Sequence, residues 1–241
     1  MKLLSIKKLQ GKITLKSGLH IGSGNMEMHI GGTDSPVIKH PHTLDPYIPG
    51  SSLKGKVRSL LELESGLMIY TKGEVVSSSI LQNSNVQNDP DKKNKCEAIL
   101  KIFGSSGADR DDETGFGPTR VSFSDCYLNA DWKAKARENR WQLAEVKSEN
   151  SIDRIKGTAL NPRFIERVPE GTEFDFLVTF KVLEESDEKL FTEYLLKGLK
   201  LLEMDALGGN GSRGYGRIKF SSLILNDKED FTAKFDELNP F

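Results

Sequence analysis

Apolar and polar residues alternate over residues 173–183, which is the period of a strand with one buried face. Ser186 and Asp187 then open a helix with an acidic first turn and a clear apolar stripe. Five glycines in residues 208–216 end this helix, and residues 216–225 predict another strand. A strand, a helix and a strand in this order must bury one face of a sheet under the helix.

The first half of the chain repeats this order of elements. Residues 9–15 predict a strand, a long glycine-punctuated loop follows, and the apolar residues of 53–61 recur at helical spacing. A further strand is predicted at residues 119–128. The order strand, helix, strand, strand, helix, strand is typical of an α+β fold of the ferredoxin-like or RRM-like kind. In that fold a four-stranded antiparallel sheet carries two helices on one face.

Two stretches do not fit this core, and we interpret them as insertions in a single domain that spans residues 1–241. Residues 70–118 are mostly polar, with one short helical stretch near residues 98–103, and they predict a lid-like helical insertion. Residues 129–170 are basic and contain turn signals, and they predict a hairpin.

Charge and cysteine content exclude several classes of protein. Lys and Arg number 34 against 35 Asp and Glu, so the net charge is −1 and any nucleic-acid site must be local. Cys96 and Cys126 lie far apart and outside any C-x-x-C pair, which favours two buried thiols over a disulfide or a zinc site. We find neither a bilayer-length apolar run nor a signal-peptide core, so we expect a cytoplasmic protein without a membrane partner.

The segment LGGNGSRGYGR, residues 207–217, carries the strongest functional signal. Its glycines allow backbone amides to approach a phosphate closely, and Arg213 and Arg217 can supply positive charge. The segment matches neither a P-loop nor a Rossmann motif. Glycine richness alone leaves a connection without a ligand equally open.

Together with other motifs, this segment resembles the signature loop of the RAMP superfamily, the RRM-like proteins of CRISPR systems. Residues 19–24 (LHIGSG), residues 47–55 (YIPGSSLKG) and the pair Phe103-Gly104 follow in the order that this superfamily shows. The segments HIGGTDS, which ends at Ser35, and LNPRFIER, which ends at Arg167, are similar to the multi-copy backbone subunit of type III-A (Csm) CRISPR complexes. The resemblance covers nearly the whole chain.

The resemblance implies a subunit that binds guide RNA and cleaves complementary target RNA at regular intervals, as an endoribonuclease active within the assembled complex. The implied partners are guide RNA, target RNA, further copies of the chain in a filament, and other Csm subunits. Those subunits are the large polymerase-nuclease subunit, the small subunit and the end-capping RAMP subunits. Two alternatives stay open: a non-catalytic structural RNA-binding filament subunit, and a stand-alone endoribonuclease that trims CRISPR precursor RNA.

Asp34 is the catalytic residue that the resemblance implies, although an aspartate beside Ser35 and Pro36 is more often an ordinary turn residue. RNA carries its own nucleophile in the 2′-hydroxyl, so one carboxylate near a distorted phosphodiester could orient or deprotonate it. The same carboxylate could hold Mg²⁺ or another divalent cation, and we expect cleavage to depend on such an ion without a dedicated cage. Other possible ligands fit no metal motif: Asp109, Asp111, Asp112, Glu113, His29, His40 and His42.

A helix start and a basic stretch supply further RNA-binding residues. Ser51 or Ser52 is expected to cap the helix, with unpaired amides beside Lys54 and Arg58 as a phosphate site. His20 can stack on a base or contact a phosphate. The RNA-binding residues that the resemblance implies are His20, Ser51, Ser52, Lys54, Arg58, Arg154, Lys156, Arg163, Gly209, Gly211, Ser212 and Arg213.

The basic stretch around residues 133–167 carries Trp132, Trp141 and Phe164 among its cations, a mixture that suits single-stranded RNA. A surface hairpin with core aromatic residues is the alternative. The resemblance implies that this region is a thumb-like hairpin that wedges into the guide–target duplex. The apolar residues available as the wedge are Ile155, Ala159 and Leu160.

Overall fold

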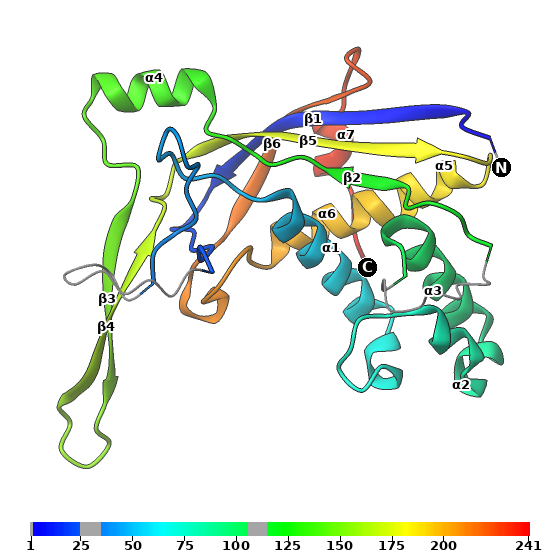
Figure 1. Cartoon of the computed structure of the whole chain (residues 1–241), viewed down its shortest axis with the longest axis horizontal. Coiled ribbons are helices and arrows are strands. Elements are labelled where there is room, and N and C mark those ends of the chain that lie inside the picture. The colour runs from blue at the N-terminus through cyan, green and yellow to red at the C-terminus, as the bar shows by residue number, and fades with distance from the viewer. Residues whose placement is uncertain (1, 25–34, 106–114) are drawn as a thin grey trace.

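The computed structural model describes residues 2–24, 35–105 and 115–241 of the chain (Figure 1). Within these residues its main sheet has five strands in the order β2-β5-β1-β6-β7, and all neighbours are antiparallel. The long strand β1 lies in the centre, between β5 and β6. The strands are β1 (Ser5–Leu15), β2 (Val121–Phe123), β5 (Glu173–Val182), β6 (Ile218–Leu225) and β7 (Glu229–Asp230).

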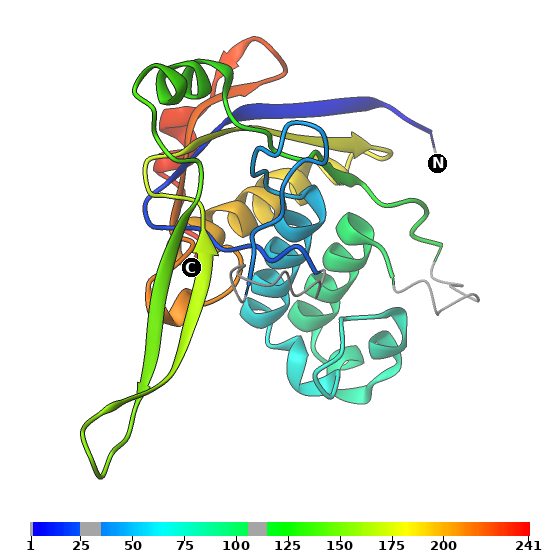
Figure 2. The same cartoon turned by 60° about the vertical axis from the view of Figure 1, so that its left-hand side comes forward.

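Helices cover one face of this sheet. Helices α1 (Gly50–Glu64), α3 (Pro90–Phe103) and α6 (Leu196–Met204) lie on the same side of the strands in Figures 1 and 2. The alternating apolar residues of β5 are buried, Phe174 and Phe180 completely. A Cβ atom on Gly198 of α6 would lie 2.7 Å from Val57 Cγ1 of α1, so the glycine allows these two helices to pack closely. The predicted α+β fold is confirmed, although the described sheet has a fifth strand, because the short β7 pairs with β6 at its edge.

The helix expected after β5 changes its winding along its length. It consists of α5 (Asp187–Lys189), a π-helical segment (Leu190–Leu195) and α6. Ser186 makes no side-chain cap. The buried carboxylate of Asp187 instead accepts a hydrogen bond from the Leu183 amide at 2.8 Å and pairs with the buried Arg120 at 3.3 Å.

The stretch of residues 70–118 contains more helix than its polar composition suggested. Helix α3 begins at Pro90, well before the predicted residue 98, because Asp89 caps it through the Lys92 amide and proline suits the first helical position. Its buried residues, among them Cys96 and Phe103, join the main core. Shorter elements precede it: 3-10 turns at Leu67–Tyr70 and Ser78–Gln82, and α2 (Ser84–Gln87).

The stretch of residues 129–170 forms a helix and then a hairpin. Helix α4 (Ala130–Glu138) was not predicted, and Asn129 caps it by accepting a hydrogen bond from the Trp132 amide at 3.2 Å. Strands β3 (Glu145–Ile152) and β4 (Ala159–Arg167) pair antiparallel in a sheet of their own, as expected for a hairpin. Figures 1 and 2 show α4 on one side of the main sheet and the hairpin reaching far out on the other.

Other boundaries differ in detail from the prediction. The strand expected at residues 119–128 is interrupted: regular pairing with β5 ends at Phe123, and Leu128 pairs with Phe174 of β5 again through an isolated bridge. Between them, Cys126 pairs with Ile48. Cys96 and Cys126 are buried free thiols, and burial raises the pKa of each to about 12. The described residues contain no helix with the length and apolarity that a membrane crossing requires.

Candidate RNA-binding groove

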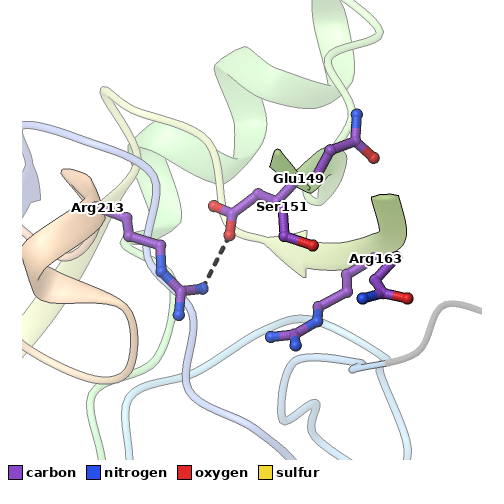
Figure 3. Close-up of a pocket in the computed structure, with 6 residues that line it drawn as sticks. Glu149, Ser151, Arg163 and Arg213 are labelled. Carbon is purple, nitrogen blue, oxygen red and sulfur yellow. Dashed lines mark hydrogen bonds and ion pairs between the residues drawn. The ribbon is translucent and has the colours of Figure 1, made fainter. Parts of the chain in front are cut away.

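A groove opens between the glycine-rich loop and the hairpin. It consists of two adjoining cavities of about 740 and 430 Å³, which share Asn161, Arg163 and Arg213. Figure 3 shows Arg163 and Arg213 on two sides of the smaller cavity. Segments far apart in the sequence line the larger cavity: His20, Ser35, residues of β4 that include Ile165, and the loop residues Gly209, Asn210 and Arg213. The fold therefore brings together four predicted RNA-binding residues, namely His20, Arg163, Gly209 and Arg213.

Close backbone contacts give the glycine-rich loop its shape. Gly208 and Gly216 have φ angles of 75° and 72°, and Cβ atoms there would lie 2.3 Å from the His20 carbonyl oxygen and 1.9 Å from that of Leu207. Several amides expected to face a phosphate instead donate to backbone carbonyl oxygens. They are the amides of Gly209, Arg213, Gly214 and Gly216. The glycines thus bring the loop against the segment that carries His20, and only part of the expected amide surface is open.

His20 is oriented by the hairpin. Its Nδ1 lies 2.7 Å from the carbonyl oxygen of Glu166. Since a carbonyl oxygen only accepts, Nδ1 carries the hydrogen, and Nε2 is the ring nitrogen left for a ligand. His20 is among the residues predicted from the sequence, whereas Glu166, which supplies its orientation, is not.

Glu166 also anchors the chain that follows Asp34. Its carboxylate accepts a hydrogen bond from the Val37 amide at 2.9 Å and pairs with Lys39 at 2.6 Å, while its amide donates to the Ser35 carbonyl oxygen at 3.1 Å. Only 13% of the Glu166 side chain is exposed. The predicted catalytic residue Asp34 lies outside the described residues, whereas Ser35, next to it in sequence, lines the groove. The one sequence signal for Glu166 is its place in the LNPRFIER segment.

A small polar network forms the wall between the loop and β3. Glu149 accepts hydrogen bonds from Arg213 at 2.9 Å and from the buried Tyr215 at 2.8 Å, and Lys147 lies 3.4 Å from it. Burial disfavours the ionised form of Glu149, but the hydrogen bonds from these partners outweigh it and lower the pKa of the carboxyl group. Burial and the bond to Glu149 raise the pKa of Tyr215 to about 12. At neutral pH the network therefore holds an anionic carboxylate and a neutral phenol.

The start of α1 differs from the predicted phosphate site. Pro49 occupies the cap position, and neither Ser51 nor Ser52 caps the helix. The Gly50 amide donates to the carboxylate of Asp125 at 2.7 Å, so a carboxylate of the protein already lies where a phosphate was expected. The expected serine cap is wrong, and the open amide surface at this helix start is smaller than predicted.

The two cations of α1 have different surroundings. Arg58 pairs with Glu62 at 2.7 Å and donates to the Val76 carbonyl oxygen at 2.6 Å, so it ties the polar insertion to α1. Lys54 forms no ion pair within the described part of the chain, and burial together with the charge of Arg58 lowers its pKa. Lys54 is therefore the cation of this pair that an anion would stabilise. Neither residue lines the two cavities of the groove.

The predicted residues of the hairpin lie at its two ends. Arg154 and Lys156 belong to the turn at the tip, where the Asp153 carboxylate accepts from the amides of Ile155 and Lys156, and Ile155 is 97% exposed. Arg163 lies nearer the base, in the groove. Trp132 and Trp141 are not on the hairpin as expected: Trp132 belongs to α4, and Trp141 follows the end of that helix. Of the possible wedge residues, Ile155 is at the tip, while Ala159 and Leu160 begin β4.

Groups of three or more His, Cys, Asp or Glu side chains that could hold a metal are absent from the described residues. Asp34, His29 and the acidic residues 109–113 lie outside them. The groove residues that are described therefore do not form a resident metal site by themselves.

The family model described as the RAMP superfamily matches residues 12–219, which include the glycine-rich loop and the hairpin. The chain belongs to the RAMP superfamily.

Similar proteins define its place within the superfamily. A Methanocaldococcus jannaschii protein named CRISPR system Cms endoribonuclease Csm3 is 40% identical over 223 residues, which are 90% of this chain and 79% of that protein. A Streptococcus thermophilus protein of the same name is 38% identical over 219 residues, which are 90% of this chain and 87% of that protein. A chain in the crystal structure of a Csm3-Csm4 subcomplex of the type III-A CRISPR-Cas interference complex is 32% identical. Its TM-score is 0.55, over 93% of this chain and 80% of that chain. The particular family is therefore that of Csm3.

Proposed function

We propose that this chain is the guide-RNA-binding backbone subunit of a type III-A CRISPR interference complex and cleaves complementary target RNA at regular intervals. The observation that carries the proposal is the groove in which His20, Arg163 and Arg213 meet beside Ser35, the neighbour of Asp34. The relatives' name, endoribonuclease, supports the activity. The subcomplex in which a similar chain was solved supports the assembly.

The groove binds the RNA backbone through its two guanidinium groups, which match phosphate geometry well. Arg213 is bonded to Glu149 in the absence of RNA, but Tyr215 and Lys147 also bond to that carboxylate. Arg213 can therefore turn toward a phosphate without leaving Glu149 unpaired, which keeps the cost of the exchange low. Nε2 of His20 supplies a further contact to a phosphate or a base.

Cleavage in this proposal uses the 2′-hydroxyl of the target RNA as the nucleophile and Asp34 as the group that orients or deprotonates it. An A-form duplex does not allow in-line attack by that hydroxyl, so the duplex must be distorted first. The exposed hairpin, with Ile155 at its tip, is the element that would wedge into the guide–target duplex. Copies of the chain stacked along the guide RNA would repeat this distortion and so space the cuts regularly.

We further propose that cleavage requires Mg²⁺ or another divalent cation, held jointly by Asp34 and RNA oxygens. The described residues offer no cage, so the RNA would complete the coordination. Such an ion would neutralise the charge that develops on the phosphate. The wider assembly would add the large polymerase-nuclease subunit, the small subunit and the end-capping RAMP subunits.

The test is reconstitution of the complex with guide RNA and complementary target, with wild type compared to Asp34→Ala. We expect equal guide and target affinity, with periodic cuts lost in the variant and, for wild type, lost in excess EDTA and restored by Mg²⁺. Preserved cleavage in Asp34→Ala would assign Asp34 an ordinary turn role. Target cleavage by the wild-type complex in excess EDTA would reject the proposed requirement for a divalent cation.

The same samples separate the two other functions. A complex that binds guide RNA but never cuts target is a structural filament. Cleavage of isolated CRISPR repeat RNA by the purified chain would indicate a stand-alone processing enzyme. Absence of salt-sensitive guide-RNA binding in the assembled complex would reject both the proposed function and the structural filament.

A further inference from the structure

The two tryptophans of the chain form a surface cluster that the groove does not use. The ring centroids of Trp132 and Trp141 are 6.2 Å apart at an interplanar angle of 46°, and 47% of Trp141 is exposed. The chain turns sharply at Arg140, whose φ is 57°, and the Trp141 amide donates to the Ala136 carbonyl oxygen at 2.8 Å. A left-handed residue just past a helix end is a common way to terminate a helix, and here this turn sets the direction of the exposed indole.

A cavity of about 380 Å³ lies against this cluster. Trp132 and Trp141 form its apolar side, and its polar lining residues are Lys135, Gln142, Glu170 and Glu173. The volume falls in the range of small-ligand pockets, in which flat apolar walls and a few polar groups set orientation.

Exposed cations lie on α4 and in the turn that follows it, and one of them, Lys135, lines the cavity. Lys135, Arg137 and Arg140 are exposed, and none of them forms a salt bridge within residues 2–24, 35–105 and 115–241. Lys135 Nζ lies 5.8 Å from the centroid of the Trp141 ring. Lys133, by contrast, is neutralised by Asp45. Of the two carboxylates that line the cavity, Glu173 is paired with Lys12 at 2.9 Å, and Glu170 has no ion pair among the described residues. Arg140 directly precedes the exposed indole in the sequence.

Only one common ligand class matches all three features. A nucleotide has a flat base for the indole, amino and imino hydrogens for Gln142 or Glu170, and an anionic phosphate for the cations. An acidic peptide would match the cations but not Glu170. A basic peptide would match Glu170 but would be repelled by the three cations.

This surface is separate from the groove. Helix α4 and the hairpin extend to opposite sides of the main sheet in both views (Figures 1 and 2). Among the residues that the structure describes, the two sites also share no lining residue. A strand bound in the groove does not account for the exposed indole.

We propose that α4 and Trp141 form a second RNA site, which stacks an unpaired base of single-stranded RNA on Trp141 and binds its backbone through Lys135, Arg137 and Arg140. The inference rests on the proposed function only in taking RNA as the ligand. Within the complex, this site would bind a single-stranded part of the target or guide RNA that lies outside the groove.

Intrinsic fluorescence reports on this site directly, because the chain has no tryptophan other than Trp132 and Trp141. We expect a single-stranded decauridylate to quench the fluorescence of the purified chain in a saturable, salt-sensitive way. The triple variant Lys135→Ala/Arg137→Ala/Arg140→Ala should weaken this binding at least tenfold. Trp141→Phe, which keeps an apolar ring, should remain folded by circular dichroism and lose most of the quenching.

The matched control is Arg163→Ala/Arg213→Ala, which alters the groove alone and should leave the quenching curve unchanged. Quenching that disappears in this control but persists in the triple variant would place the oligonucleotide in the groove and overturn the proposal. No saturable quenching with folded wild type would overturn it too, as would a response to another purified Csm subunit but not to RNA. Asp34→Ala, tested in the complex, leaves this readout unaffected, so the two proposals fail independently.

Discussion

Glu166 joins three parts of the groove, and its contacts predict a positioning role in cleavage. Its carboxylate holds Val37 and Lys39, and its backbone holds Ser35 and His20. Glu166→Ala would leave the Val37 amide and the Lys39 ammonium without this partner, at a cost of about 1–3 kcal/mol in the free energy of unfolding. We expect unchanged guide-RNA affinity and target cleavage slower by about ten- to a hundredfold, since small displacements of reacting groups are costly.

Glu166→Gln is the matched control, because it keeps an acceptor for the Val37 amide but not the charge for Lys39. Its single-turnover cleavage rate at saturating target should fall between wild type and the alanine variant. Thermal unfolding of each purified chain measures the structural part of the effect. Cleavage at the wild-type rate by a folded Glu166→Ala complex would show that the segment after Asp34 needs no such anchor.

Single residues also show the limit of sequence reasoning. Arg58 and Arg163 both lie in basic segments and both were predicted to bind RNA, yet Arg58 is engaged by Glu62 and Val76 while Arg163 faces the groove. The partner of Arg58 is a carboxylate one helical turn away, which the sequence makes visible. Its second partner, in the insertion, depends on the tertiary fold. Side-chain availability is therefore a property of the folded chain.

At the scale of elements, the glycine-rich loop divides into positions that shape the backbone and positions that face the groove. Gly216 has a positive φ, and a Cβ atom there would lie 1.9 Å from a backbone carbonyl oxygen. For Gly209 the nearest heavy atom would be 3.5 Å away. We therefore expect Gly216→Ala to lower the free energy of unfolding by about 2 kcal/mol or more. Gly209→Ala should change it by less than about 0.5 kcal/mol.

Urea unfolding of both variants measures this difference. If Gly209→Ala remains stable, its guide-RNA affinity tests the groove without interference from folding, and a weaker affinity is expected because the new methyl group enters the larger cavity. Equal stability of the two variants would mean that the loop relaxes around Gly216. The backbone contact would then not be the reason for a glycine there.

Elements with a regular pattern of apolar residues were predictable from the sequence. Elements that depend on a helix cap or on contacts with distant segments were not. The alternation in β5 was predictive because one face of the strand is buried and the other is not. Helix α4 was missed because Ala136 is its one buried residue, so it has no apolar stripe to recognise. The expected strand at 119–128 is interrupted where Cys126 pairs with Ile48, a contact between segments far apart in sequence, before Leu128 pairs with β5 again.

At the scale of the whole molecule, the order of elements was enough to predict the sheet and the helices on one face, while the groove needed the fold. Periodicity sets which face of each element is buried, and an antiparallel sheet of this order has few alternatives. The groove joins residues near positions 20, 35, 163 and 210, and no local pattern relates them. Its predicted members came from a resemblance to known motifs, and the contacts of Glu166 and Glu149 came only with the structure.

The near-zero net charge leads to a prediction about how the molecule binds RNA as a whole. With 34 basic and 35 acidic side chains, long-range attraction is weak, so RNA affinity must come from local cations such as Arg163 and Arg213. Each phosphate neutralised on a single strand contributes about −0.7 to the slope of log affinity against log salt. Arg163→Ala/Arg213→Ala should therefore reduce the magnitude of that slope by about 1.4 per bound subunit.

Lys228→Ala/Lys234→Ala removes the same charge from exposed positions around β7, away from the groove, and serves as the control. If affinity follows the local arrangement of cations, this variant keeps the wild-type slope even though its net charge matches that of the groove variant. Binding isotherms for guide RNA at several salt concentrations give the three slopes. Equal reductions of the salt slope in both variants would mean that the overall charge, and not the groove, sets the affinity. Only a long-range electrostatic field would weaken by the same amount wherever the two charges are removed.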